Sequence, residues 1–292
     1  MGCRCRYRHH GCREAWLTRR LPDQAEGLRR LFVADVRRMI AVLSAGKPAQ
    51  GNDVASCLAI GLAGQGRRVL LLDETLSAGD HHPLFGLAMK HDLDSIMLRQ
   101  TEIETAIVPC ADGIHLLAGG GQARTLPRPR METRIGLVNA FYRLAGKYDA
   151  VLVNAGRVAL HSRPSFAWAC QDVIMHCDKH ADSATEAYGY IKSLHQSGER
   201  RFNLLYGGMT QAQAQKLYRN VTTVSRRHLQ VMPEYLGVLP AAPGAAAEFM
   251  AGLASMVQSW PLPEHKGGHF PALMRRLLNG VNYPGILQAA VK

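Results

Sequence analysis

A loop that contains glycines and a lysine has the position and composition of a phosphate-binding loop. Residues 39–43 form a short apolar run, which is typical of a buried strand. Residues 54–65 repeat apolar side chains at helical spacing, and the connection between the two contains Gly46, Lys47 and Gly51. Such a loop holds phosphate with backbone N–H groups, while a lysine contacts the phosphates and a Ser or Thr binds Mg²⁺. The chemistry that this pattern indicates is nucleotide binding.

Residues 45–53 resemble the deviant Walker A motif of the MinD/ParA group of P-loop ATPases, SGKGGVGKT, with matches at Gly46, Lys47 and Gly51. The resemblance implies that Lys47 is the signature lysine, which reaches across a dimer to the partner's nucleotide. It also implies that Asn52 stands at the P-loop lysine position and Asp53 at the magnesium-binding threonine position. A carboxylate at Asp53 would repel a phosphate. It would equally serve as a helix cap, which is the interpretation that we favour.

Three further positions depart from the pattern of these ATPases. The resemblance implies that Thr75 replaces the Asp that positions the attacking water, and that Asn154 replaces the switch II Asp. It places Gly207 where the family has an Asn that contacts adenine, while Asp73 is retained. Five changed positions on a recognisable scaffold indicate a pseudo-ATPase with a vestigial nucleotide site and no catalytic residue. ATP and Mg²⁺ would be cofactors if that site retains binding.

Apolar runs alternate with helical patterns along the chain. This order predicts an α/β protein with a doubly wound, mainly parallel sheet of seven or eight strands flanked by helices, as in MinD. The ligand site is expected where strands end, at 44–53, 73–75, 119–121 and 154–156. Residues 240–247 are expected to form a loop. The strands are expected at 39–43, 68–73, 114–117, 148–154, 173–177, 202–206 and 235–239.

The segment before the first strand resembles a partner-binding motif. Residues 23–31 read DQAEGLRRL, similar to the DQAxxLR motif of the FlhG (FleN, YlxH) regulators of flagellar number and placement. The resemblance implies that this segment stimulates FlhF, the flagellar GTPase of the signal-recognition-particle type. An amphipathic helix over 22–38 could dock in a groove, and the alternative is a helix packed on its own domain. The candidate partner-binding residues are Asp23, Gln24, Ala25, Leu28, Arg29 and Arg30.

A second amphipathic pattern lies near the C-terminus. Its apolar residues recur at i, i+3, i+4, i+7 and i+8, and the family resemblance implies that such a helix binds the inner-membrane surface. Because the stretch is short and contains Pro271, we favour a helix docked on the sheet. The membrane candidates are Phe270, Leu273, Met274, Leu277 and Leu278.

Charge and cysteine content restrict the remaining classes. The net charge is +12, and residues 1–38 hold ten arginines against four acidic residues. A basic arm suggests an acidic partner, but we find no basic helix face outside the arm and therefore rank nucleic acid low. Seven scattered cysteines argue against a disulfide scaffold, and the tight Cys/His spacing near the N-terminus argues against a metal site. No run is long and apolar enough for a membrane span.

The sequence thus predicts four parts: a basic, disordered arm (1–21), a partner-binding helix (22–38), a MinD-like domain (39–280) and a tail (281–292). The expected location is the cytoplasm, with the inner-membrane surface or cell pole as a further option. The expected function is an FlhG-like regulator that acts by protein contact on the flagellar GTPase, and on flagellar switch or transcription components. The alternative is a functional MinD/ParA-type ATPase with ATP-dependent dimerisation and membrane or DNA association.

Overall fold

The computed structural model describes residues 38–46, 54–120, 144, 147–157, 165–180, 182–196 and 198–261. Several candidate residues therefore lie outside the described part: Lys47, Gly51, Asn52 and Asp53 of the loop, the partner-binding candidates in 23–30, and the membrane candidates in 270–278. Within the described part, no helix combines the length and the hydropathy that crossing a bilayer requires.

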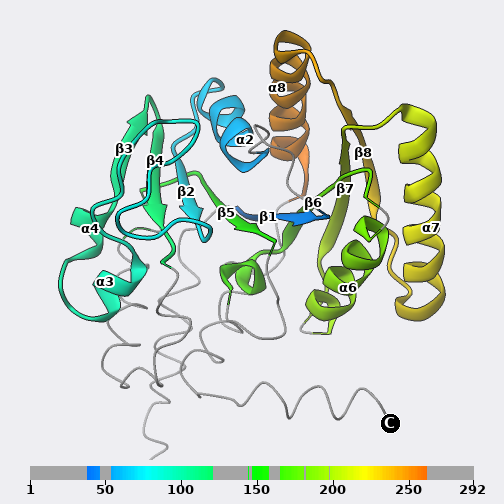
Figure 1. Ribbon diagram of the computed structural model, residues 1–292, viewed down its shortest axis with the longest axis horizontal. Coiled ribbons are helices and arrows are strands. Elements are labelled where there is room, and N and C mark those ends of the chain that lie inside the picture. The colour runs from blue at the N-terminus through cyan, green and yellow to red at the C-terminus, as the bar shows by residue number, and fades with distance from the viewer. Residues whose placement is uncertain are drawn as a thin grey trace, which may run out of the picture.

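An eight-stranded sheet forms the centre of the molecule, in the order β3-β4-β2-β5-β1-β6-β7-β8 (Figure 1). Every pairing is parallel except that of β3 with β4, which is antiparallel. This confirms the predicted mainly parallel α/β sheet. The strands are β1 (Met39–Ala45), β2 (Val69–Asp73), β3 (Val108–Ala111), β4 (Ile114–Ala118), β5 (Ala150–Gly156), β6 (Asp172–Cys177), β7 (Arg201–Gly207) and β8 (Glu234–Leu239).

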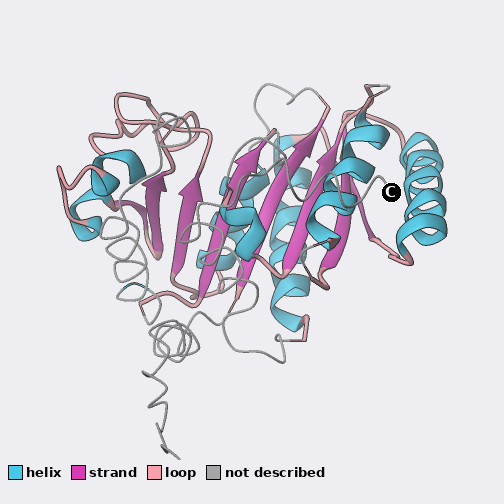
Figure 2. Ribbon diagram, turned by 90° about the horizontal axis from the view of Figure 1, so that it is seen from below, coloured by secondary structure: helices cyan, strands magenta, loops and turns pink. Residues whose placement is uncertain are grey.

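Helices cover both faces of this sheet, as Figure 2 shows. α2 and α8 pack on one face, where Leu58 and Met250 belong to one hydrophobic core. The other face is covered by the remaining elements, whose buried residues form a second core that includes Ile191 and Val221. The elements are α2 (Val54–Ala63), α3 (Leu93–Met97), α4 (Ile103–Ala106), η1 (Phe166–Ala169), α6 (Ser183–His195), α7 (Gln211–Leu229) and α8 (Pro243–Ser259).

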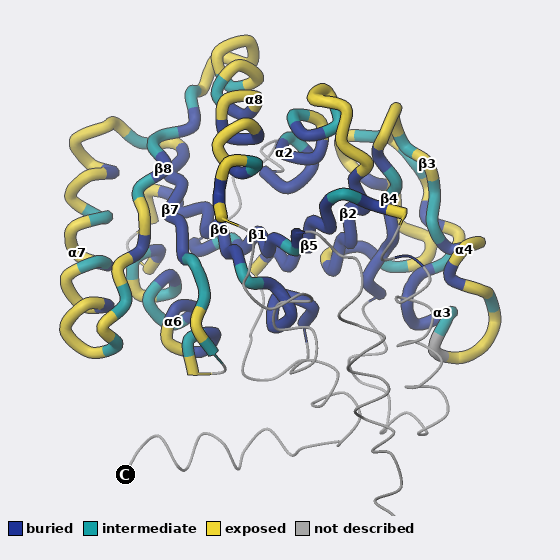
Figure 3. The backbone as a smooth tube through the Cα atoms, turned by 180° about the vertical axis from the view of Figure 1, so that it is seen from behind, coloured by how far each residue is buried: buried dark blue, intermediate teal, exposed yellow. Residues whose placement is uncertain are grey.

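The central strands are buried on both sides (Figure 3). All five residues of β2 and all six of β6 are buried. Parallel strands covered on both faces require such continuous burial, which explains the apolar runs at 69–72 in β2 and 173–175 in β6. The described ends of these strands, such as Asp73 of β2, are therefore positioned by a sheet that is covered on both faces.

Two details differ from the sequence prediction. The expected loop at 240–247 is wrong in its second half, because α8 begins at Pro243. Proline is favoured in the first helical turn, and the alanines that follow are strong helix formers. The sequence interpretation also missed β3, a four-residue edge strand whose residues alternate between half-buried and exposed and which contains Pro109.

Candidate functional site at the carboxyl edge of the sheet

The carboxyl ends of β2 and β5 bring together three of the residues selected from the sequence. The parallel register pairs Asp73 directly with Asn154, and Thr75 follows β2 by two residues. The Asn154 Nδ2 group donates a hydrogen bond of 2.9 Å to Asp73 Oδ2. The prediction that these segments meet at one edge is therefore confirmed for this pair of strands.

Asp73 is a buried carboxylate surrounded by donors from its own chain. It is 1 % exposed. Its Oδ1 atom accepts hydrogen bonds from the Thr75 backbone N–H (2.8 Å) and from Thr75 Oγ1 (2.6 Å). Together with Asn154, these neutral donors occupy both carboxylate oxygens. A buried carboxylate is stabilised by hydrogen bonds to its charged form, so Asp73 does not depend on a cation for its partners.

His82 is a buried part of this cluster that the sequence interpretation missed. Its Nδ1 atom accepts from the backbone N–H groups of Leu84 and Phe85, both at 3.2 Å. That arrangement places the ring proton on Nε2, which lies 3.1 Å from Ser56 Oγ and 3.7 Å from Asp73 Oδ2. The imidazole thus bridges α2 and the end of β2. No periodic pattern in the sequence marked His82, because the loop after β2 determines its position.

Glu74 anchors a neighbouring element. It is 6 % exposed. Its Oε2 atom accepts from Ser165 Oγ and its Oε1 atom from the Phe166 backbone N–H, both at 2.6 Å. Ser165 is the N-cap of η1, so the Glu74 carboxylate fixes the start of that short helix. Glu74 therefore has a structural role in the segment 73–75.

Gly46, the first glycine of the loop, lies between two acidic side chains. Its φ is +96°, and a Cβ atom there would lie 2.1 Å from Asp178 Oδ1, so only glycine fits. The Gly46 N–H donates to Glu186 Oε2 at 2.8 Å. Hydrogen bonding to Arg157 lowers the pKa of Glu186, which keeps this carboxylate ionised. A backbone N–H at the start of the loop is therefore already paired with an anion of the same chain.

The resemblance places an adenine-contacting Asn at Gly207. In the structure, His176 of the neighbouring strand β6 occupies the space that a side chain at 207 would need. A Cβ atom on Gly207 would lie 2.4 Å from His176 Nε2. His176 is 3 % exposed, and burial lowers its pKa, which favours the neutral ring. Its Nε2 atom has no hydrogen-bond partner among the described residues. An asparagine at 207 would thus require His176 to move.

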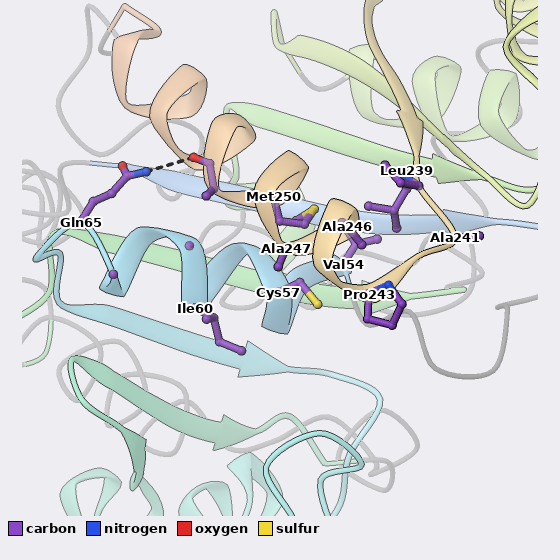
Figure 4. Close-up of a pocket in the computed structure, with 14 residues that line it drawn as sticks. Val54, Cys57, Ile60, Gln65, Leu239, Ala241, Pro243, Ala246, Ala247 and Met250 are labelled. Carbon is purple, nitrogen blue, oxygen red and sulfur yellow. Dashed lines mark hydrogen bonds between the residues drawn. The ribbon is translucent and has the colours of Figure 1, made fainter.

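A cavity of about 520 Å³ lies between α2 and α8, next to the point where the loop enters α2. Figure 4 shows Val54 and Cys57 from α2 facing Leu239 and Met250 across it. Its lining is mainly apolar, and the Gln65 amide at its border already donates to Ala251 O at 3.0 Å. The cavity has room for an apolar or planar group, but the side chains that line it offer no acid–base pair.

The described side chains at this edge do not offer a suitable set of oxygen ligands to a hydrated Mg²⁺ ion. The oxygens of Asp73 already accept three hydrogen bonds, and the adjacent position presents the N–H₂ of Asn154. Magnesium prefers oxygen ligands in near-octahedral geometry. In the described part of the chain, no three His, Cys, Asp or Glu side chains are grouped so as to hold a metal ion.

Comparisons with known proteins bear on the fold and on the relatives of the chain. No protein-family model matches the sequence. The chain is 27% identical over 260 residues to "Antiactivator FleN" of Pseudomonas aeruginosa, which covers 82% of this chain and 93% of FleN. The match spans nearly all of that relative, so the similarity is not confined to a nucleotide-binding loop.

Solved structures with a similar fold include MinD proteins. The MinD of the MinC:MinD cell division complex of Aquifex aeolicus gives a TM-score of 0.54 at 14% identity, covering 79% of this chain and 100% of that one. The cell division ATPase MinD of Pyrococcus furiosus gives 0.53 at 16% identity, covering 84% and 100%. The chain therefore has the fold of the MinD/ParA-type P-loop ATPases, and its sequence is similar to that of FleN over most of its length.

Proposed function

We propose that this protein is an FlhG/FleN-like regulator of flagellar number and placement that acts by protein contact and does not hydrolyse ATP. The observation that carries the proposal is the similarity to the antiactivator FleN across 93% of that protein. The segment 22–38 is the proposed contact with an FlhF-like GTPase, and 39–280 is the proposed MinD-like domain. Further contacts with flagellar switch or transcription components belong to the same proposal.

The loss of ATPase activity is supported by the side chains at the carboxyl edge. Asn52 and Asp53 stand where the resemblance places the phosphate-binding lysine and the magnesium ligand. Asp73 accepts from Thr75 and Asn154, and the Gly46 N–H is bound by Glu186. The contacts of Asp73 occupy carboxylate oxygens that would otherwise face hydrated Mg²⁺. The contact with Glu186 occupies a backbone N–H that would otherwise donate to a phosphate. The protein is therefore proposed to keep the fold as a scaffold for contacts.

Nucleotide titration tests this part of the proposal. With Mg²⁺ present, a fluorescent ATP analogue should show no saturable binding in the submillimolar range, and purified protein should release no phosphate above a buffer control. Lys47→Ala should change neither result, because Asn52 and Asp53 stand where the resemblance places the phosphate-binding lysine and the Mg²⁺ ligand. Submillimolar binding with turnover that Lys47→Ala removes would establish the alternative, a functional MinD/ParA-type ATPase.

The partner contact is tested with a purified flagellar GTPase of the FlhF type. The full chain should accelerate GTP hydrolysis. Gln24→Ala should abolish the acceleration if the amide reaches the GTPase site, and Leu28→Asp should abolish it by placing a charge in an apolar groove. Glu26→Ala, on another face of the expected helix, is the matched control and should keep the stimulation. Equal stimulation by all variants would show that the segment has only a structural role.

A further inference from the structure

The cavity between α2 and α8 is an apolar groove that opens to solvent. The residues that line it include Ile60, which is 46 % exposed, together with the exposed Ala247 and Ala251. No charged residue lines it. Figure 4 shows Cys57 of α2 and Ala247 of α8 at this groove, which we call the α2/α8 groove. Exposed apolar surface of this kind marks an interaction site, so the occupant that it fits has an apolar face.

A segment of the same chain ends beside this groove. Arg38 is the first described residue, and its Nη2 atom donates to the carbonyl of Trp260, directly after α8, at 2.7 Å. The groove begins at Ala251 of the same helix, which lies about 14 Å from Trp260 along the helix axis. Residues 33–37 span up to about 17 Å when extended. Residues 22–32 can therefore reach the groove.

The length and the apolar pattern of residues 22–32 match the groove. As a helix, this segment is about 16 Å long, and the part of α8 that lines the groove, from Pro243 to Ala251, is about 12 Å long. Ala25, Leu28 and Phe32 recur at i, i+3 and i+7, on one side of the expected helix. That side is the apolar face that the groove would cover.

The charges at the groove favour the same occupant. α2 contains no charged residue, and Glu248 is the only one in α8. Glu248 is exposed and lies three residues before Ala251, on the side of α8 that lines the groove. Arg29 follows Ala25 by four residues, so it borders the apolar side of the expected helix. An arginine at that border has an exposed carboxylate to pair with, and no cation on α2 or α8 to repel it.

We propose that the α2/α8 groove binds residues 22–32 of its own chain and keeps them from the GTPase. Gln24 and Arg29 both border the apolar side of the expected helix, so docking covers polar residues that the proposed GTPase contact uses. The segment then has two competing partners, and the fraction of undocked chains sets its apparent affinity for the GTPase. The competition rests on the proposed function, whereas the docking involves this chain alone.

Cross-linking tests the docking without a GTPase. Cys57 lines the groove and is not in a disulfide, so it reports on a cysteine placed in the segment. In the full chain, Ala25→Cys treated with a short bis-maleimide should give a monomeric product that peptide mass spectrometry maps to positions 25 and 57. Arg30→Cys, on the opposite side of the expected helix, is the control and should link several-fold less. Adding Cys57→Ser to Ala25→Cys should remove the product.

A charge placed in the groove tests the competition. Ala247 and Ala245 are both exposed on α8, but of the two only Ala247 lines the groove. Ala247→Glu should reduce the link between positions 25 and 57 several-fold, because burying an unpaired carboxylate opposes docking. It should also lower the concentration of this protein that gives half-maximal GTPase stimulation, by about tenfold if about nine tenths of the chains are docked. Ala245→Glu, the same change on another side of α8, should alter neither result.

Several outcomes would overturn the proposal. Equal linking of Ala25→Cys and Arg30→Cys would show that the segment does not dock by its apolar side. A dimeric product would assign the groove to the segment of a second copy. Linking of Leu277→Cys to Cys57, without linking of Ala25→Cys, would assign it to the C-terminal stretch. Unchanged GTPase stimulation in Ala247→Glu, with the cross-link lost, would exclude the competition.

Failure of this inference and failure of the proposed function give different results. Stimulation of the GTPase by the native chain, without the link between positions 25 and 57, would refute the docking and leave the proposed function standing. A chain that cross-links as expected but never stimulates the GTPase would refute the proposed function and the competition, and the docking would remain.

Discussion

Replacing Asp172 with alanine should lower the free energy of unfolding by about 3–5 kcal/mol, because it leaves a buried arginine without its counter-charge. Asp172 is 3 % exposed and lies at the start of β6. Its Oδ2 atom accepts from Arg38 Nη1 at 3.2 Å and its Oδ1 atom from Arg201 Nη1 at 3.0 Å. Burial lowers the pKa of Arg38, which shows how poorly its charge is solvated.

The contacts around this cluster explain why alanine cannot be accommodated cheaply. Arg38 Nη2 also donates to the Trp260 carbonyl at 2.7 Å, and the Arg201 guanidinium lies 5.2 Å from the Trp260 ring centroid. The cluster therefore joins the chain before β1 to the end of α8. Without Asp172, Arg38 remains fixed among these neighbours with no anion to balance it.

Urea denaturation followed by circular dichroism measures the loss. The control is Asp149→Ala, which breaks an ion pair with Arg68, whose side chain is 58% exposed, and also removes the acceptor of the Arg68 backbone N–H. Exposed pairs contribute little, because water and salt screen them, so this control should lose far less stability than Asp172→Ala. A double variant, Arg38→Met with Asp172→Leu, should recover much of the stability, because apolar replacement of a buried pair is often neutral. Equal losses in Asp172→Ala and Asp149→Ala would contradict the argument.

The fold was predictable from sequence because strands that are buried on both faces appear as continuous apolar runs. β2 reads Val-Leu-Leu-Leu-Asp, and neither a loop nor an amphipathic helix has that pattern. β3 has no continuous apolar run. It is an edge strand with one neighbour, and its residues alternate between half-buried and exposed. The error at 240–247 has a different cause. Alanine and proline are read as a loop from composition, although proline in the first turn is a helix signal.

The site was predictable only where strand order alone determines it. Asp73 and Asn154 meet because parallel strands end at the same edge. The contact of Gly46 with Glu186 joins residues 140 positions apart, and His82 enters the cluster through an irregular loop. Neither contact follows from a repeating pattern.

The second large loss of stability is expected for a substitution of Asn154, at the carboxyl edge of the sheet. Replacing Asn154 with aspartate would convert the 2.9 Å amide-to-carboxylate hydrogen bond into a contact between two carboxylates. Because Asp73 is 1 % exposed, water cannot screen the repulsion well. The variant should lose about 2–4 kcal/mol of unfolding free energy near pH 7. Asn154→Ala is the control, since it removes the same hydrogen bond without adding charge and should lose less, about 1–3 kcal/mol.

The pH dependence of Asn154→Asp identifies the cause. Two adjacent carboxylates raise the pKa of one member above its ordinary value, so a proton bound to the folded pair stabilises the variant at low pH and is lost as pH rises through that pKa. The difference between Asn154→Asp and Asn154→Ala should therefore shrink from about pH 7 to about pH 5.

The effect of Mg²⁺ on the melting temperature is an independent test of the same variant. Millimolar Mg²⁺ should raise the melting temperature of Asn154→Asp more than that of Asn154→Ala or the native chain, because only the variant presents two carboxylates to a cation. Such a gain would indicate that the amide of Asn154 is what keeps a cation from this edge. Identical responses of all three proteins to Mg²⁺ would place the obstacle elsewhere, in the Thr75 and His82 contacts that also surround Asp73.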